Sequence, residues 1–202
     1  MYNSKIVCIT GPDGSGKSTL INQLLHQYPN SKKIGIWDAF ALNKNKIFIN
    51  KSSIDDYLCG LSSIARTFFL THALLESMKN IAKSESSIVF FDSYFYKYYS
   101  SELALGTPLH IIKSLEQYFV KPDLVISLNC KVETCASRKN TFTRYECGLI
   151  DQPNEHTFIN FQNKCSQNWI HFQQENWIHV NAENTPEYLL KTTIKNINIL
   201  CK

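Results

Sequence analysis

The sequence lacks the features that mark several classes of protein. No stretch of its 202 residues approaches the roughly 20 apolar residues of a membrane helix, and the opening segment has no long apolar core with a cleavage site. The seven cysteines are scattered and form no CxxC pair, which argues against a zinc site or a redox dithiol. These absences favour a cytoplasmic protein with free thiols and no membrane partner.

Charge and linker sequences are also sparse. Charged residues make up 19% of the chain and the net charge is +4. This charge suits a small anionic ligand, but it is not gathered into the basic stripe that nucleic-acid binding requires, so we expect no nucleic-acid partner. Because no repeat and no Gly/Ser-rich or Pro-rich linker divides the chain, we expect residues 1–202 to form one domain.

Apolar segments that predict strands alternate with segments of helical periodicity. The predicted strands are residues 5–10, 33–37, 87–91, 123–128 and 177–180. The predicted helices are residues 17–28, 61–82, 107–119, 156–175 and 185–199, with a short helix before residue 138. Thr107-Pro108 and Thr185-Pro186 each predict an N-cap followed by proline in the first turn.

The strands are apolar throughout rather than alternating, which indicates a parallel sheet covered on both faces. Right-handed crossovers then give a three-layer α/β/α sandwich with a sheet of about five strands. In such sheets, ligands bind outside the carboxyl ends of the strands.

A phosphate-binding motif stands between the first predicted strand and helix. Residues 11–19 read Gly-Pro-Asp-Gly-Ser-Gly-Lys-Ser-Thr, which matches G-x-x-x-x-G-K-[ST] and indicates an α/β fold of the P-loop NTPase type. Glycines allow the backbone N–H groups to approach phosphate oxygens, and a helix N-terminus favours negative charge. A glycine-rich turn that matches by chance is the weaker alternative. We expect the motif to bind ATP phosphates through Gly11, Asp13, Gly14, Ser15, Gly16, Lys17, Ser18 and Thr19.

Three side chains extend this site toward a reaction. Asp92 follows a predicted apolar strand, where its carboxylate can hold Mg²⁺ together with the Ser18 hydroxyl. Arg138 and Arg144 lie in a polar stretch that resembles a lid, over about residues 138–148, and with Lys17 and Asp92 they are the candidate catalytic residues. The alternatives are a solvated strand-end aspartate and a solvated basic loop.

Aromatic residues follow Asp92 in the run Tyr94-Phe95-Tyr96-Lys97-Tyr98-Tyr99. Some of these rings can stack on a base or sugar at the edge of the site. Others belong in the core, and for Phe95 the core is the better prediction.

With these motifs in place, the chain resembles the thymidylate kinase family of nucleoside monophosphate kinases. The phosphate loop carries an acidic residue, Asp13, as the family's loop does, and Asp92-Ser93-Tyr94 corresponds to the family's Asp-Arg-Tyr. The segments PDLVISLNC, VETCASRK, Thr143 to Glu146 and NWIHVNAENTPEYLL are similar to the family's fourth strand, lid and final strand and helix. The resemblance thus spans nearly the whole chain.

The resemblance implies an acceptor site on which the chain departs from the family. It implies that Asp13, Phe68 and Tyr94 contact the acceptor, with Phe68 stacking on the base, and it places His72 where the family has a phosphate-binding arginine. Ser93 replaces a second arginine, and the family's Arg-Glu-Pro-Gly-Gly-Thr after the second strand is absent. Arg66 and Lys97 are the candidates to supply the missing positive charge.

Three functions follow in order of preference. The first is transfer of the γ-phosphoryl group of ATP, with Mg²⁺, to a nucleoside monophosphate, dTMP by default. The second keeps the kinase but changes the acceptor, and the third is a nucleotide-binding protein without acceptor chemistry. The apolar faces of the helix over 61–82 would serve a homodimer interface or, alternatively, only cover the sheet.

Overall fold

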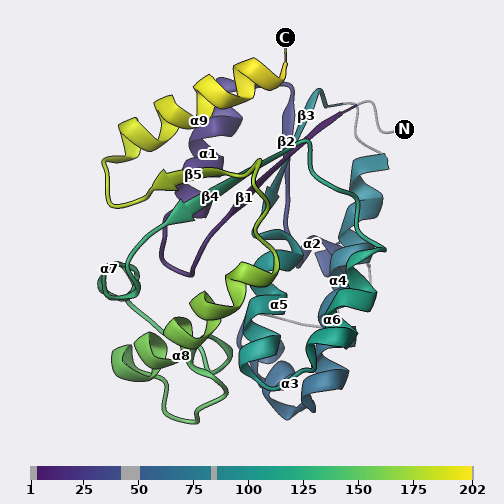
Figure 1. Cartoon of the computed structure of the whole chain (residues 1–202), viewed down its shortest axis with the longest axis vertical. Helices are drawn as coiled ribbons and strands as arrows, with labels where there is room; N and C mark the ends of the chain where they lie inside the picture. The colour runs from purple at the N-terminus through teal and green to yellow at the C-terminus, as the bar shows by residue number, and fades with distance from the viewer. Residues whose placement is uncertain (1–3, 42–50, 83–85, 202) are drawn as a thin grey trace.

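The structure of the protein, a computed structural model, describes residues 4–41, 51–82 and 86–201. Its centre is a parallel sheet of five strands in the order β2-β3-β1-β4-β5 (Figure 1). The central strand, β1, pairs Cys8 with Phe91 of β3 on one side and with Val125 of β4 on the other. The strands are β1 (Lys5–Thr10), β2 (Ser31–Ile34), β3 (Ile88–Asp92), β4 (Leu124–Asn129) and β5 (Ile178–Asn181).

Helices cover both faces of the sheet. Figure 1 shows α1 and α9 together on one side, while α4 and α5 lie on the other side, with α6 and α8 packed against α5. The helices are α1 (Lys17–Gln27), α2 (Asp38–Ala41), α3 (Lys51–Gly60), α4 (Ser63–Ala82), α5 (Tyr94–Ala104), α6 (Leu109–Glu116), α7 (Val132–Ser137), α8 (Glu155–Asn168) and α9 (Pro186–Leu200). Short 3₁₀ turns form at η1 (Tyr145–Cys147) and η2 (Trp169–His171).

Each face of the sheet has its own core, because successive strand residues point to opposite faces. Val7 and Ile9 pack with Leu24 of α1 and Ile197 of α9. Ile6 and Cys8 contribute to the opposite core, which holds the apolar side chains of α4 and the aromatic side chains of α5. The predicted three-layer α/β/α sandwich with a parallel sheet is confirmed.

Three helices, α2, α3 and α5, were not predicted, and several boundaries differ. The aromatic run after Asp92 forms α5, in which Tyr94, Phe95, Tyr96, Tyr98 and Tyr99 are all buried. A helix that is apolar on every side is a buried helix, and it lacks the one-sided periodicity by which helices are recognised. The predicted strand 33–37 is β2 at Ser31–Ile34, and the predicted helix 156–175 is α8 followed by η2.

The helix predicted over 61–82 is α4, and its apolar residues divide between two environments. Leu74 and Met78 are buried against the sheet, as the covering role predicts. Ile64 and Phe68, by contrast, expose 44% and 52% of their surface. Within the described residues, none of the helices combines the length and the hydropathy that a membrane crossing needs. The seven cysteines are free thiols.

Candidate active site

The phosphate loop runs from the end of β1 at Thr10 to the start of α1 at Lys17. Gly11, Gly14 and Gly16 have φ angles of 145°, 83° and 94°, which side-chain-bearing residues rarely adopt. At Gly14 a Cβ atom would also lie 2.3 Å from the carbonyl oxygen of Cys135 in α7. The loop therefore depends on glycine for its conformation and for its close approach to α7.

Lys17 lies folded against the loop that it begins. Its Nζ donates hydrogen bonds to the carbonyl oxygens of Gly11 at 3.0 Å and Pro12 at 2.6 Å, and only 7% of the residue is exposed. Burial lowers the pKa of Lys17, and the negative charge of Asp13 works against that shift. Because an ammonium group has three donors, one N–H remains for a phosphate oxygen in this arrangement.

Two oxygen ligands meet where α1 begins and β3 ends. The Ser18 hydroxyl donates to Asp92 Oδ2 at 3.1 Å, which is possible because β1 and β3 are neighbours in the sheet. A hydroxyl and a carboxylate are ligands that Mg²⁺ accepts, usually with phosphate oxygens and water completing its shell. Because the described residues contain no group of three His, Cys, Asp or Glu side chains suited to a metal ion, the nucleotide would have to supply further ligands.

The positive charges of three lysines act on Asp92. Burial by itself would raise the pKa of Asp92, but the hydrogen bond from Lys33 and the charges of Lys17, Lys33 and Lys97 hold this pKa below its ordinary value. Lys33 Nζ lies 2.8 Å from Asp92 Oδ2, the same oxygen that Ser18 contacts. Cations from β2, α1 and α5 thus converge on the end of β3.

Sequence reasoning missed Lys33. The second strand was predicted to start at this residue, whereas Lys33 actually lies near the end of β2, beside β3. A strand predicted two residues earlier would have placed this lysine at the active edge of the sheet, where cations for phosphates are expected.

Asp13 and Lys97 form a close ion pair between the phosphate loop and α5. Lys97 Nζ lies 2.5 Å from Asp13 Oδ1, and the side chains expose only 16% and 15% of their surface. Burial would lower the pKa of Lys97, but the charge of Asp13 raises it above its ordinary value. Burial would likewise raise the pKa of Asp13, but Lys97 and Lys17 bring it below its ordinary value. Both groups are therefore charged at neutral pH.

The segment predicted as a lid is anchored at its second half. η1 lies within it, and the Asp55 carboxylate of α3 accepts the backbone N–H groups of Arg144 and Tyr145 at 3.1 and 3.0 Å. Lys139 and Glu146 pair at 3.2 Å, and the positive charge of Lys139 contributes to the lowered pKa of Asp13. Lys139 is thus a lid cation that acts electrostatically on the phosphate loop.

The two candidate lid arginines have other partners. Arg138 donates to the carbonyl oxygen of Ala182, next to β5, at 3.0 Å. Arg144 lies 2.7 Å from Asp151 and 3.9 Å from Asp56. Within the described part of the chain, neither arginine has a hydrogen bond or ion pair to the phosphate loop, and their catalytic roles stay predictions.

Phe68 and His72 lie one turn apart on α4, and both are exposed. An exposed aromatic ring one helical turn from a histidine suits contact with a base. The assignments of Phe68 and His72 to the acceptor stay predictions.

The expectation that Tyr94 contacts the acceptor is corrected by the structure. Its side chain is 1% exposed, its hydroxyl donates to the Val120 carbonyl oxygen at 2.8 Å, and its ring packs against Phe91 and Phe119. The start of α5 turns this ring into the core. Tyr94 is therefore a core residue, as Phe95 was predicted to be.

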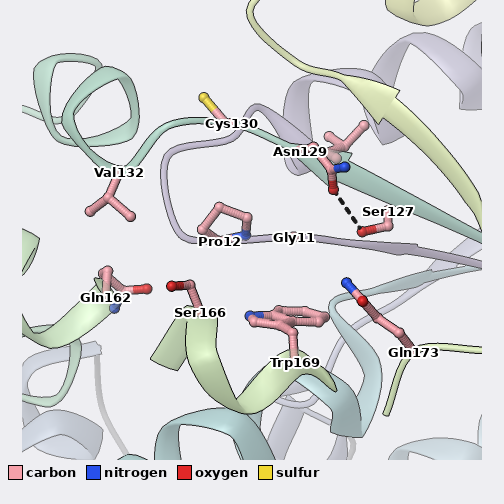
Figure 2. Close-up of a pocket in the computed structure, with 11 residues that line it drawn as sticks. Gly11, Pro12, Ser127, Asn129, Cys130, Val132, Gln162, Ser166, Trp169 and Gln173 are labelled. Carbon is pink, nitrogen blue, oxygen red and sulfur yellow. Dashed lines mark hydrogen bonds between the residues drawn. The ribbon is translucent and has the colours of Figure 1, made fainter. Parts of the chain in front are cut away.

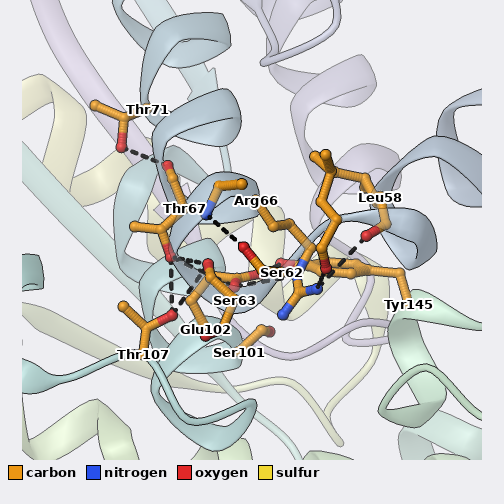
Figure 3. Close-up of polar contacts among 12 residues, drawn as sticks. Leu58, Ser62, Ser63, Arg66, Thr67, Thr71, Ser101, Glu102, Thr107 and Tyr145 are labelled. Atoms are coloured by element: carbon orange, nitrogen blue, oxygen red, sulfur yellow. Dashed lines mark hydrogen bonds and ion pairs between the residues drawn. The ribbon is translucent and has the colours of Figure 1, made fainter.

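Arg66 is likewise turned away from ligands, and the prediction for it is wrong. Its guanidinium donates to both carboxylate oxygens of Glu102 at 2.9 and 3.1 Å, and the residue is 1% exposed. Tyr145 of η1 donates to the same carboxylate at 2.9 Å, and Thr67 bonds Thr107 nearby (Figure 3). The arginine neutralises a buried carboxylate that joins α4, α5 and η1.

A cavity of about 190 Å³ lies on the side of the phosphate loop that faces α8. Figure 2 shows Gly11 and Pro12 on one side of it, and Gln162, Ser166 and Trp169 on the other. Lys17, Ser18 and Asp92 do not line this cavity. The metal-binding candidates therefore lie outside it.

The groups around the loop fit a polyphosphate and its metal ion. The buried Ser15 hydroxyl has no hydrogen-bond partner within the described chain, which is unusual for a buried polar atom and suits a ligand oxygen. Ser18 and Thr19 are exposed at the start of α1, where the helix N-terminus favours negative charge.

The comparisons with known proteins match this chain to thymidylate kinases. The family model for thymidylate kinase matches residues 9–193. A protein named probable thymidylate kinase 1 from Saccharolobus solfataricus is 29% identical over 146 residues, which cover 70% of this chain and 74% of that protein. A probable thymidylate kinase from Methanocaldococcus jannaschii is 26% identical over 152 residues, covering 72% of this chain and 75% of that protein.

A solved structure has the same fold. The thymidylate kinase of Candida albicans superimposes with a TM-score of 0.73 at 17% sequence identity. The likeness covers 98% of this chain and 92% of that one, so the arrangement of strands and helices is shared almost throughout.

Proposed function

Because the chain belongs to the thymidylate kinase family, we propose that the residues around its phosphate loop transfer the γ-phosphoryl group of ATP to dTMP. The protein is an ATP-dependent phosphotransferase of the nucleoside monophosphate kinase type. The observation that carries the assignment of the site is the meeting of Lys17, Ser18 and Asp92 at the ends of β1 and β3.

Phosphoryl transfer needs little covalent chemistry from the protein, so positioning and charge do most of the work. Backbone N–H groups of residues 11–19 and the Lys17 ammonium would hold the β- and γ-phosphates. Ser18 and Asp92 would hold Mg²⁺, which when bound neutralises developing charge on the phosphate oxygens. Asp13 and Phe68 would orient the acceptor, with His72 beside them.

The lid is the second half of this proposal. Arg138 and Arg144 would leave the Ala182 carbonyl and Asp151 to approach the transferring group, whereas Lys139 already acts on Asp13. Cations placed over the phosphoryl group stabilise charge that grows in the transition state. We treat residues 1–202 as one kinase domain, with this lid over about residues 138–148.

The test is a coupled assay of ADP release with Mg²⁺, ATP and dTMP. We expect turnover that depends on dTMP and that falls by about 10²–10³-fold in Lys17→Met, because a preorganised cation at the phosphates is lost. Lys191→Met, which changes an exposed lysine of α9, is the matched control and should retain the wild-type rate. ADP release that does not rise with dTMP would reject this acceptor.

The alternatives gain no support from the comparisons. A different acceptor and a non-catalytic role were suggested by the missing arginines, yet Lys17, Lys33 and Lys97 converge on the site. A screen of nucleosides and nucleotides with the same assay would separate them, since a kinase for unphosphorylated alcohols would be saturated by thymidine rather than by dTMP.

We further propose a cytoplasmic, nucleotide-dependent enzyme without a nucleic-acid partner. Seven free thiols fit a reducing compartment, and cell fractionation would test it. Homodimerisation through the exposed part of α4 around Ile64 is a second proposal. Light scattering of the wild type and of Ile64→Glu would reveal a dimer and its loss.

A further inference from the structure

The acceptor brings negative charge into a site that already contains two carboxylates. A phosphate monoester carries close to two charges at neutral pH, and Asp13 and Asp92 both have lowered pKa values and are ionised. Position 93, where the family resemblance expects an arginine, holds Ser93, which is 3% exposed and donates to Asp92 Oδ1 at 3.2 Å. A cation is needed near this carboxylate, and position 93 does not supply it.

Most of the neighbouring cations are already in use. Arg66 is buried against Glu102, and Lys97 is held by Asp13 at 2.5 Å. Lys17 contacts the loop carbonyls on the donor side, and Lys139 pairs with Glu146. These groups are also less accessible to a second phosphate: the side chains of Lys97 and Lys139 are 16% and 19% exposed, and Lys17 and Arg66 are buried.

Lys33 is placed differently. Its side chain is 34% exposed, so solvent and ligands can approach it, and its ammonium lies 2.8 Å from Asp92 Oδ2. With one donor directed to that oxygen, two N–H groups remain for another anion. The Lys33 ammonium and the Ser93 hydroxyl contact the two oxygens of one carboxylate, so the lysine brings its charge to the same group that position 93 contacts.

We propose that Lys33 binds the phosphate group of the acceptor and replaces, from the neighbouring strand, the positive charge that Ser93 does not provide. The inference rests on the proposed function, because it concerns the acceptor of that reaction. β2 runs parallel to β3 with Lys33 opposite Phe90, so a side chain of lysine length reaches past the end of β3. In this proposal, the positive charge at the acceptor phosphate comes from β2, the strand next to β3, and not from the turn after β3.

The test measures equilibrium binding rather than turnover. Lys33→Met removes the charge but keeps most of the apolar stem, and we expect its dTMP affinity to fall by about 10–100-fold, the loss typical of a charge-assisted hydrogen bond. Affinities for thymidine and for Mg²⁺-ATP should stay at wild-type values, because neither ligand presents the acceptor phosphate. Lys33→Arg keeps the charge and should bind dTMP within about tenfold of wild type.

Two further variants sharpen the result. Lys32→Met is the matched control, since Lys32 is exposed, precedes Lys33 in β2 and points to the other face of the strand. Ser93→Arg in the Lys33→Met background should regain at least half of the lost binding free energy. Thermal unfolding of each variant shows whether it is folded. If one of the other variants does not fold, the dTMP affinity of Lys33→Arg still tests the proposal.

Three results would overturn the proposal: unchanged dTMP affinity in Lys33→Met, equal loss of dTMP and thymidine affinity, or weakened Mg²⁺-ATP binding with dTMP binding intact. The last result would assign Lys33 to the metal side of Asp92. If the wild type itself neither binds nor phosphorylates dTMP, the proposed function fails. If the wild type does both and Lys33→Met matches it, only the role of Lys33 fails.

Discussion

Individual side chains at this site work as charged pairs whose members come from different segments. Asp13 pairs with Lys97 of α5, and Asp92 pairs with Lys33 of β2. The charge of Asp13 raises the pKa of Lys97, and the lysines hold the pKa values of Asp13 and Asp92 below their ordinary values. A polyphosphate therefore meets cations that are already fixed in place.

Gly14→Ala should impair ATP binding and stability. The φ of 83° costs a side-chain-bearing residue about 1–2 kcal/mol, and the added Cβ would lie 2.3 Å from the Cys135 carbonyl oxygen. We expect ATP affinity to fall at least tenfold, about 1.4 kcal/mol, by titration calorimetry. Gly106→Ala shares the positive φ but meets no atom within 4 Å, so it should lose stability and keep ATP affinity.

Stability at acid pH should depend on Asp13. Its pKa is lowered in the folded protein, so its contribution is fully present above the unfolded value of about 3.9 and is lost as the pH falls through the folded value. Denaturant unfolding from pH 7 down to pH 3 should therefore show a shallower acid slope for Asp13→Asn than for the wild type. Equal slopes below pH 4 would contradict the ion pair with Lys97.

Helices α4 and α5 and the turn η1 are joined by one buried carboxylate. Glu102 accepts hydrogen bonds from Arg66 and Tyr145 in a region closed to solvent (Figure 3). Burial raises the pKa of Glu102, while the hydrogen bond and the charge of Arg66 oppose that shift. The same junction sets the position of α4, which carries Phe68 and His72.

Arg66→Met should destabilise the protein by about 3–5 kcal/mol, because it leaves the Glu102 carboxylate buried without a cation. The double variant Arg66→Met/Glu102→Met should recover at least half of that loss, since it removes both charges, although the Tyr145 hydroxyl and the Leu61 carbonyl oxygen lose these partners. Chemical denaturation of the two variants and the wild type measures both effects. A double variant as unstable as the single one would show that the ion pair itself stabilises the fold.

Some element boundaries could be predicted because the local chemistry decides them. At α9, Thr185 accepts from the backbone N–H of Tyr188 at 3.3 Å and Pro186 occupies the first turn, as predicted. The same Thr-Pro pattern at 107–108 places the N-cap of α6 one residue too early. Pro108 is the N-cap, and the Thr107 hydroxyl bonds Thr67 instead. A tertiary partner outcompeted the local cap there.

The conformation of the phosphate loop could be predicted, and the grouping of side chains around Asp92 only in part. The phosphate loop is contiguous, so its motif reports all of its groups together. Lys33, Lys97 and Asp92 come from three separate segments, and only the order of strands brings them together. Tyr94 was assigned to the site through the family resemblance and Arg66 as a replacement for a missing cation, yet the direction of each side chain depends on its helix.

The fold as a unit positions the site through its strand order. With β1 between β3 and β4, the phosphate loop, Asp92 and the lid segment after α7 meet at one edge of the sheet. The fold likeness to the Candida albicans enzyme persists at 17% identity, while the cations around the acceptor differ from the family pattern. The scaffold is retained, and under our proposal for Lys33 the positive charge at the acceptor phosphate comes from β2 instead of position 93.

Mg²⁺-ATP should stabilise the folded protein by mass action. At a free concentration of about 100 times its dissociation constant, a ligand that binds only the folded state adds about 2.7 kcal/mol. For a chain of this length, that corresponds to an increase in Tm of about 5–11 °C. Lys17→Met should lose most of this shift in differential scanning fluorimetry, whereas Lys191→Met should keep it; a shift that survives in Lys17→Met would place ATP elsewhere.

The exposed ring of Phe68 has a calorimetric consequence. Half of this residue, 52%, faces water in the structure. If a thymine base covers the ring, ordered water leaves an apolar surface, and association acquires a negative heat capacity change. The enthalpy of dTMP binding would then become steadily more exothermic between 10 and 35 °C, and Phe68→Ala would flatten that slope.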